Sequence, residues 1–183
     1  DSEHVLSLTR MQRLRIEQLE LLIANRNISF QFLAENDGMS RSTVVMDMSQ
    51  IESNLALFNL KLVKSPNRGT YVEGSELFRR CAIINIIRNE LGLVKYYGIG
   101  MDRQYTPGAD QTIPAQINDF IGSLNITQCF QYIDLIEKGI GMHLALFSRV
   151  DMVFYLAIMK KYIQDRIQGK AENTHFNHEI FAV

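Results

Sequence analysis

The sequence predicts a mainly α-helical fold in which a three-helix unit with a β-hairpin precedes a second, all-helical part. Apolar residues recur at intervals of three and four along most of the 183-residue chain, as they do in amphipathic helices. The interval shortens towards two only in the stretches LKLV and TYV. The loop SPNRG between these stretches contains Pro66 and Gly69, which favour turns.

Two helices are predicted before residue 38. The first runs from Thr9 to Ala24, and Asn25 to Asn27 end it. Its apolar residues at helical spacing are Ile16, Leu19, Leu22 and Ile23, with the charged residues Arg13, Glu17 and Glu20 between them. Ser29 is expected to cap a short second helix, FQFLAEN, whose Phe30, Leu33 and Ala34 face inward.

A third helix is predicted to begin after an N-cap at Ser40. One apolar stripe follows it at intervals of 4, 3, 4 and 3, through Val44, Met48, Ile51, Leu55 and Phe58. The opposite face is polar or mixed. Three such helices followed by a hairpin, over about Thr9 to Gly74, predict a winged helix-turn-helix, in which the N-terminal end of the third helix enters a DNA groove. The chain is therefore predicted to be a DNA-binding transcription regulator, with duplex operator DNA as its partner.

The predicted DNA contacts form a small local group. They are Ser40, Arg41, Ser42, Thr43 and Met46 on the third helix and Lys61, Lys64 and Arg68 on or near the wing. Up to Glu76 there are 8 Lys and Arg against 10 Asp and Glu, a balance of −2, and the whole chain carries a formal −1. Affinity must therefore come from this local cluster, doubled by formation of a homodimer, and not from a general positive field.

Helices are also predicted for the second part, so that residues 1–74 form a DNA-binding domain and 75–183 a helical regulatory domain. Ser75 is expected to cap a helix that ends at Leu91, and residues 92–112, with four glycines and a proline, to form a long connector. Shorter helices are expected over 113–122 and 127–138, and a last one from an N-cap at Ser148 to Gly169. The side chains expected to be buried on the first of these helices are Leu77, Phe78, Cys81, Ile84, Ile87 and Leu91.

Several function classes find no support in the residues. No apolar run is long enough for a membrane span and the first residues do not resemble a secretion signal, so a cytoplasmic location is expected. Cys81 and Cys129 fit neither a disulfide framework nor a zinc site, and we expect both to be reduced core residues. No phosphate loop or nucleophile motif indicates an enzyme, and no cofactor is expected. The histidines, His4, His143, His175 and His178, do not form a metal site, and His143 is interpreted as a packed or surface residue.

One pattern extends from the predicted helix-turn-helix into the next helix. It consists of Leu33-Ala34, Ser40 to Val44 with Asp47 and Leu55, and Gly69, Tyr71, Gly74, Glu76 and Arg80. In this pattern the chain resembles bacterial BglG-type transcriptional activators with PTS-regulation domains. The resemblance implies a helix-turn-helix joined to helical modules that are phosphorylated on histidine by the sugar phosphotransferase system. PTS phosphocarrier or sugar-specific PTS proteins would then be partners. Asp47, Glu76 and Arg80 are interpreted as structural, with Glu76 and Arg80 paired at i and i+4.

Residues 147–170 resemble the segment of the first such module that carries a histidine seven residues before an arginine. Aligning on Arg166 places Met159 at the histidine position, and aligning on YLAI places Tyr155 there. Neither side chain is an imidazole, so no residue is assigned as a phosphorylation site, although the module could still dimerise. The resemblance also implies that the chain is a fragment containing an incomplete first module.

Two alternatives remain beside the sugar-linked activator. One is a protein-interaction or dimerisation module whose winged helix no longer binds DNA, which the acidic balance permits. The other is an RNA-binding antiterminator, whose members carry a small β-rich RNA-binding domain in place of a helix-turn-helix. Retention on heparin or generic DNA at low salt would separate the first alternative from a DNA-binding protein.

Overall fold

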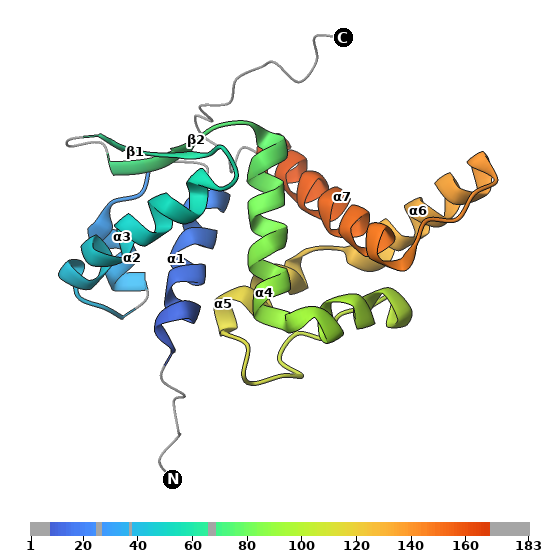
Figure 1. Cartoon of the computed structure of the whole chain (residues 1–183), viewed down its shortest axis with the longest axis horizontal. Coiled ribbons are helices and arrows are strands. Elements are labelled where there is room, and N and C mark those ends of the chain that lie inside the picture. Colours follow the sequence, from blue (N-terminus) through green and yellow to red (C-terminus); the bar gives the residue numbers. More distant parts are fainter. Residues whose placement is uncertain (1–7, 25–26, 37, 66–68, 169–183) are drawn as a thin grey trace. The chain divides into compact units, whose positions relative to one another are not determined.

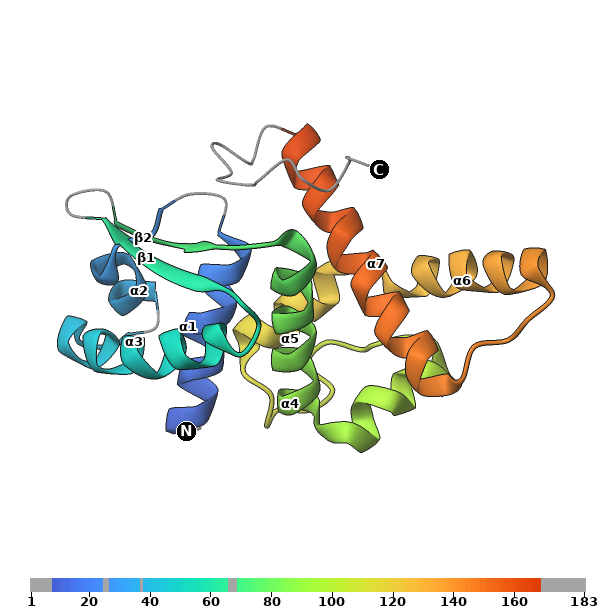
Figure 2. The same ribbon diagram turned by 45° about the horizontal axis from the view of Figure 1, so that its top comes forward.

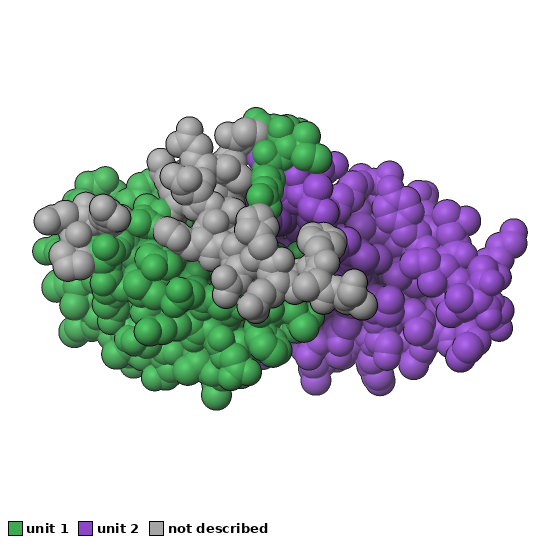
Figure 3. Space-filling model, turned by 90° about the horizontal axis from the view of Figure 1, so that it is seen from above, with its two compact units in different colours: residues 1–83, 166–183 green, residues 84–165 purple. Residues whose placement is uncertain are grey.

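The computed structural model describes residues 8–24, 27–36, 38–65 and 69–168. The chain divides into two compact units, residues 1–83 with 166–183 and residues 84–165, which Figure 3 colours separately. The fold is mainly helical, with a β-hairpin in the first unit and helices after it, which confirms the predicted fold class. None of the helices in the described ranges is long and apolar enough to cross a membrane.

The first unit begins with three helices, α1 (Arg10–Ile23), α2 (Phe30–Asn36) and α3 (Arg41–Ala56). Side-chain oxygens of Thr9, Ser29 and Ser40 accept hydrogen bonds from backbone N–H groups in the first turns of these helices. The caps predicted at Ser29 and Ser40 are therefore confirmed. Figures 1 and 2 show α2 and α3 beside each other, with α1 next to α3.

The core of the first unit follows the predicted stripes with four exceptions, of which one is Phe30, predicted to face inward but only half-buried. The buried residues include Leu14, Ile16, Leu19, Leu22, Leu33, Ala34, Val44, Met48, Ile51 and Leu55. Ile23, predicted to be buried, is 39% exposed, whereas Glu17, predicted to lie on the charged face, is fully buried. Phe58 lies beyond the end of α3 and is only half-buried, because the helix stops at Ala56.

The hairpin consists of β1 (Lys61–Ser65) and β2 (Gly69–Glu73), which pair antiparallel from Lys61 with Glu73 to Ser65 with Gly69. β1 contacts α3, and β2 contacts α1. An extra bridge joins β2 to the segment between α1 and α2, because Ile28 and Thr70 exchange backbone hydrogen bonds of 2.8 and 2.7 Å. Both strands of the wing therefore pack against helices of the first unit.

Arg79 fixes the wing to α1 through two buried hydrogen bonds. Its Nη1 donates to the carbonyl oxygen of Leu22 at 2.9 Å and its Nη2 to that of Val72 at 2.6 Å. These carbonyls belong to the last turn of α1 and to β2, so one guanidinium satisfies buried backbone oxygens on two elements. Arg80 pairs with Glu76 at 2.8 Å, as predicted.

The next helix, α4 (Glu76–Asp102), is longer than the sequence predicts. It continues through most of the stretch expected to be a connector, with a kink at Gly92, whose φ of 72° and ψ of 156° are not helical. Leu77 and Phe78 are exposed and Cys81 is half-buried, contrary to prediction. Ile84, Ile87 and Leu91 are buried as predicted, and Ala82, Ile83 and Ile86 are buried beside them.

The second unit is completed by α5 (Ala115–Ser123), α6 (Ile126–Ile140) and α7 (Leu146–Ile167). The predicted N-cap at Ser148 is wrong, since α7 already begins at Leu146. Tyr96 belongs to the core of this unit, where it is fully buried and stacked on Phe154 with ring centroids 5.0 Å apart. Its hydroxyl donates to Asp151 at 2.9 Å, and burial raises the pKa of this phenol.

Candidate nucleic-acid interface

The outward face of α3 carries most of the residues predicted to contact DNA. Arg41 and Ser42 are exposed, Thr43 is half-buried, and Met46 is 67% exposed. Their positions follow from the amphipathic pattern, because Val44, Met48 and Ile51 occupy the opposite face and are buried. The N-terminal half of α3 therefore presents a connected strip of surface without a neighbouring element over it in the described part of the first unit.

The serine and threonine hydroxyls at this end of α3 bind one another. Ser40 Oγ accepts the backbone N–H of Thr43 at 3.1 Å and lies 2.7 Å from Ser42 Oγ and 2.8 Å from Thr43 Oγ1. This arrangement caps the helix and fixes the first turn. Arg41, which stands beside it, makes no hydrogen bond or ion pair within the described ranges, so its guanidinium is available to a ligand.

Asp47 holds α3 against α1 behind this face. Its carboxylate is 2% exposed and accepts a 2.7 Å hydrogen bond from Arg13 Nε, while Arg10 Nε lies 3.5 Å away. The hydrogen bond to Asp47 raises the pKa of the Arg13 guanidinium. The structural role predicted for Asp47 is confirmed, and the pair sets the orientation of α3 against the rest of the first unit.

The basic side chains predicted on or near the wing differ in their surroundings. Lys61 is exposed and makes no ion pair among the described residues. Lys64 Nζ instead lies 3.0 Å from Glu52 Oε2, with both side chains about half exposed (48% and 50%). Arg68, also predicted to contact DNA, lies outside the described residues. Sequence reasoning does not identify Glu52, because its partner is on another element.

Two further side chains of α3 belong to this surface but are absent from the predicted contacts. Val45 is 49% exposed next to Met46, and Gln50 is exposed one turn further on. The amide of Gln50 donates to Asn54 at 3.1 Å. The helical period alone is enough to place both residues on the outward face. Val45 is missing from the predicted contacts because those were chosen mainly among polar and basic residues.

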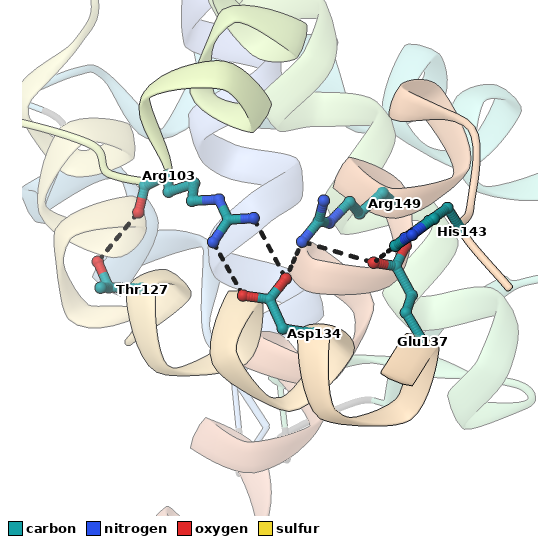
Figure 4. A network of polar contacts seen from close by, with 6 residues as sticks. All are labelled: Arg103, Thr127, Asp134, Glu137, His143 and Arg149. Carbon is teal, nitrogen blue, oxygen red and sulfur yellow. Dashed lines mark hydrogen bonds and ion pairs between the residues drawn. The ribbon is translucent and has the colours of Figure 1, made fainter. Parts of the chain in front are cut away.

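In the second unit, a polar network links Arg103, which follows α4, with residues of α6 and with Arg149 of α7 (Figure 4). Arg103 binds Asp134 with Nη1 at 2.8 Å and Nη2 at 3.2 Å, and Arg149 binds the same carboxylate. Glu137 is buried and accepts the backbone N–H of Leu144 at 2.8 Å. Burial, together with the charge of Arg103, lowers the pKa of Arg149.

His143 lies at the edge of this network. Its Nδ1 is 3.5 Å from Glu137 Oε2, and its side chain is 90% exposed. His143 is therefore a surface residue, which is one of the two positions expected for it. The other histidines, His4, His175 and His178, lie outside the described residues. Tyr155 and Met159, the two alternative positions at which the resemblance would place a histidine, are both half-buried on α7.

No group of three or more His, Cys, Asp or Glu side chains in the described ranges is placed to hold a metal ion. Cys129 is buried and free, and burial raises the pKa of its thiol. Cys81 is also free and half-buried, so only Cys129 lies fully in the core as expected.

Three packed helices, an antiparallel wing and an outward third helix define a winged helix-turn-helix, the fold of many DNA-binding regulators. Residues 1–85 match the family model described as the Mga helix-turn-helix domain. This match indicates a DNA-binding transcription regulator. No curated protein and no solved structure matches the chain.

Proposed function

We propose that the chain is part of a sugar-linked transcription regulator that binds operator DNA as a homodimer. In this proposal the N-terminal half of α3 enters the major groove, and the wing cations bind phosphates on either side of it. The observation that carries the proposal is the position of Arg41. Its guanidinium is exposed and unpaired within the described residues, at the end of the helix that reads DNA in this fold.

An electrophoretic shift assay tests the assignment of the reading helix. Arg41→Ala should weaken operator binding by about tenfold or more, because a bidentate arginine contact to a base contributes roughly 1–3 kcal/mol. Lys138→Ala is the matched control. It removes the same charge from an exposed position on α6 and should leave affinity unchanged. Equal affinity of Arg41→Ala and the unmodified chain would disprove the role given to α3.

Dimerisation is part of the proposal because one copy of this surface is weakly basic. The contacts offered by one protomer are few, and residues up to Glu76 carry a balance of −2. Two copies related by a two-fold axis would double the phosphate contacts and require half-sites about one helical turn apart, roughly 10 base pairs. Cytoplasmic location accords with access to the chromosome.

The link to sugar supply rests on the resemblance to BglG-type activators. We infer that the helical second unit receives the signal of the phosphotransferase system, with PTS phosphocarrier or sugar-specific proteins as partners. The supporting experiment compares operator affinity before and after incubation with the phosphocarrier and phosphoenolpyruvate-dependent enzyme. A change in affinity that persists in His143→Ala would support signalling without phosphoryl transfer to this imidazole, whereas no change in either protein would contradict the link.

The competing proposal is a protein-interaction module whose winged helix no longer binds DNA. It is favoured by the exposed apolar residues Val45 and Met46 and by the negative balance. Retention on heparin or generic DNA at low salt supports DNA binding, and passage through both matrices supports the competing proposal. The RNA-binding antiterminator is not favoured, since the N-terminal unit is mainly helical and not a small β-rich domain.

A further inference from the structure

The surface of α3 that would face the bases carries a pair of exposed apolar side chains. Val45 is 49% exposed and Met46 67% exposed, and they occupy adjacent positions in the second turn of the helix. No described element covers them. Both side chains would be dehydrated by any ligand that docks on this face, so their ligand must offer apolar groups at that point.

The polar side chains around this pair already form hydrogen bonds with other residues of α3 or with its N-cap. Ser42 binds Ser40, Ser49 Oγ donates to the carbonyl of Met46 at 3.3 Å, and Ser53 Oγ donates to that of Ser49 at 3.0 Å. Gln50 donates to Asn54. Among these polar residues of the strip, Arg41 makes no hydrogen bond or ion pair inside the described structure. Most of the remaining contact area belongs to the two apolar side chains.

In the major groove, the apolar group that distinguishes one base from the others is the C5 methyl of thymine. We propose that Val45 and Met46 form a thymine-reading pair, so that the operator of this protein carries A·T pairs beneath the second turn of α3. This inference rests on the DNA-binding function proposed above and specifies which bases that function recognises. Arg41, one turn earlier, would contact the adjacent base pair or its phosphate.

The test uses the full 183-residue chain and begins with a random duplex pool, so no operator sequence has to be chosen beforehand. Binding sites are enriched from this pool at low salt, and each thymine of the enriched site is then replaced by deoxyuridine. This replacement removes only the methyl group and leaves base pairing intact. At one or two positions it should weaken binding about three- to fourfold, the effect of losing one buried methyl.

Two variants assign that effect to the pair. Val45→Ser and Met46→Gln should each bind the thymine site more weakly and should lose sensitivity to deoxyuridine at one position. Leu57→Gln is the matched control, because Leu57 is 82% exposed at the other end of the same helix and should keep the full deoxyuridine effect. All three positions are exposed, so circular dichroism should show native helix content for each variant.

The outcomes separate this inference from the function beneath it. Failure to enrich any site would overturn DNA binding itself, and with it the thymine pair. Enrichment of sites without deoxyuridine-sensitive positions would overturn the thymine pair alone. The same holds if Met46→Gln and Val45→Ser keep the full sensitivity of the unmodified chain, and the exposed pair would then be a surface for another protein.

Discussion

Asp47 is a single buried carboxylate that holds one helix against another. It lies on the buried side of α3 and is bound by Arg13 from α1. Asp47→Asn should lower the free energy of unfolding by about 2 kcal/mol, since it removes the charge from a buried pair and leaves Arg13 without its ionic partner. Urea denaturation followed by circular dichroism measures the change.

Glu52→Gln is the control for this prediction. It removes a carboxylate from the same helix, but the pair of Glu52 with Lys64 is about half exposed and should contribute at most a few tenths of a kcal/mol. A loss of stability in Glu52→Gln as large as that in Asp47→Asn would mean that burial does not determine the difference.

Asp110 provides a pH-dependent contribution in the second unit. A hydrogen bond from Lys95, with further ones from Thr112, lowers the pKa of this carboxyl to about 2 from an ordinary value of 3.8. A carboxyl with a depressed pKa in the folded state stabilises the fold above the unfolded pKa and loses this effect as the pH falls through the folded one. Asp110→Asn should therefore lower the melting temperature at pH 7, and its curve should approach that of the unmodified chain between about pH 4 and pH 2.

This difference in melting temperature should be unaffected between pH 5 and pH 8, where Asp110 stays ionised in both states. A difference that grew towards pH 2 would contradict the assignment of Lys95 and Thr112 as the cause.

Among the elements, the wing depends on close approach of two backbones at Gly69. This residue has a φ of +89°, and a Cβ there would lie 2.8 Å from the carbonyl oxygen of Ile28. Gly69→Ala should cost roughly 2–4 kcal/mol, which combines the left-handed backbone with a clash at the Ile28–Thr70 bridge. Thermal unfolding and hydrogen exchange at Thr70 would measure it.

Gly38→Ala separates the two contributions to the cost at Gly69. Gly38 has a φ of +65° with nothing within 4 Å of its added Cβ, so only the backbone contribution of about 1 kcal/mol is expected. If the two alanine variants were equally stable, the close approach to Ile28 would not matter for the wing.

Helix caps and stripes of the first unit are predictable from sequence because they depend on neighbours within four residues. Ser29, Ser40 and the apolar residues of α3 are examples. The second half of α4 is not predictable in this way. Its glycines indicate a connector, but burial of Tyr96 against Phe154 favours the helix over local propensity.

The same distinction between local and long-range interactions applies to the candidate site. The helical period identifies which α3 residues face outward, and the turn chemistry places the wing cations near them. The sequence pattern does not reveal that Glu52 forms an ion pair with Lys64, or that Arg79 binds the carbonyls of Leu22 and Val72. These contacts join residues 12, 57 and 7 positions apart, and they exist only once the elements have packed.

For the molecule as a whole, the charge distribution makes a prediction about assembly. If Arg41, Lys61, Lys64 and Arg68 each bind a phosphate, as proposed, one protomer neutralises four phosphates and a dimer twice that number. The slope of log K against log salt concentration should therefore be roughly −7 for a dimer in which all of them bind, and roughly −3 to −4 for a monomer. Fluorescence anisotropy from about 50 to 200 mM salt measures this slope.

Sedimentation of the complex under the same conditions gives an independent count of protomers. A steep slope with a single protomer on the DNA would contradict the homodimer and require additional cations at the interface.

Arg79 also decides how the DNA-binding part can be isolated. It follows the hairpin in sequence, and its guanidinium binds α1 and β2. A fragment cut at Gly74 would leave the carbonyls of Leu22 and Val72 without their hydrogen bonds to Arg79, and so would weaken the attachment of the wing to α1. The smallest fragment that keeps the wing in place must therefore include the first turns of α4, as the unit ending at Ile83 does. Because α4 runs from Glu76 to Asp102, it contributes residues to both compact units.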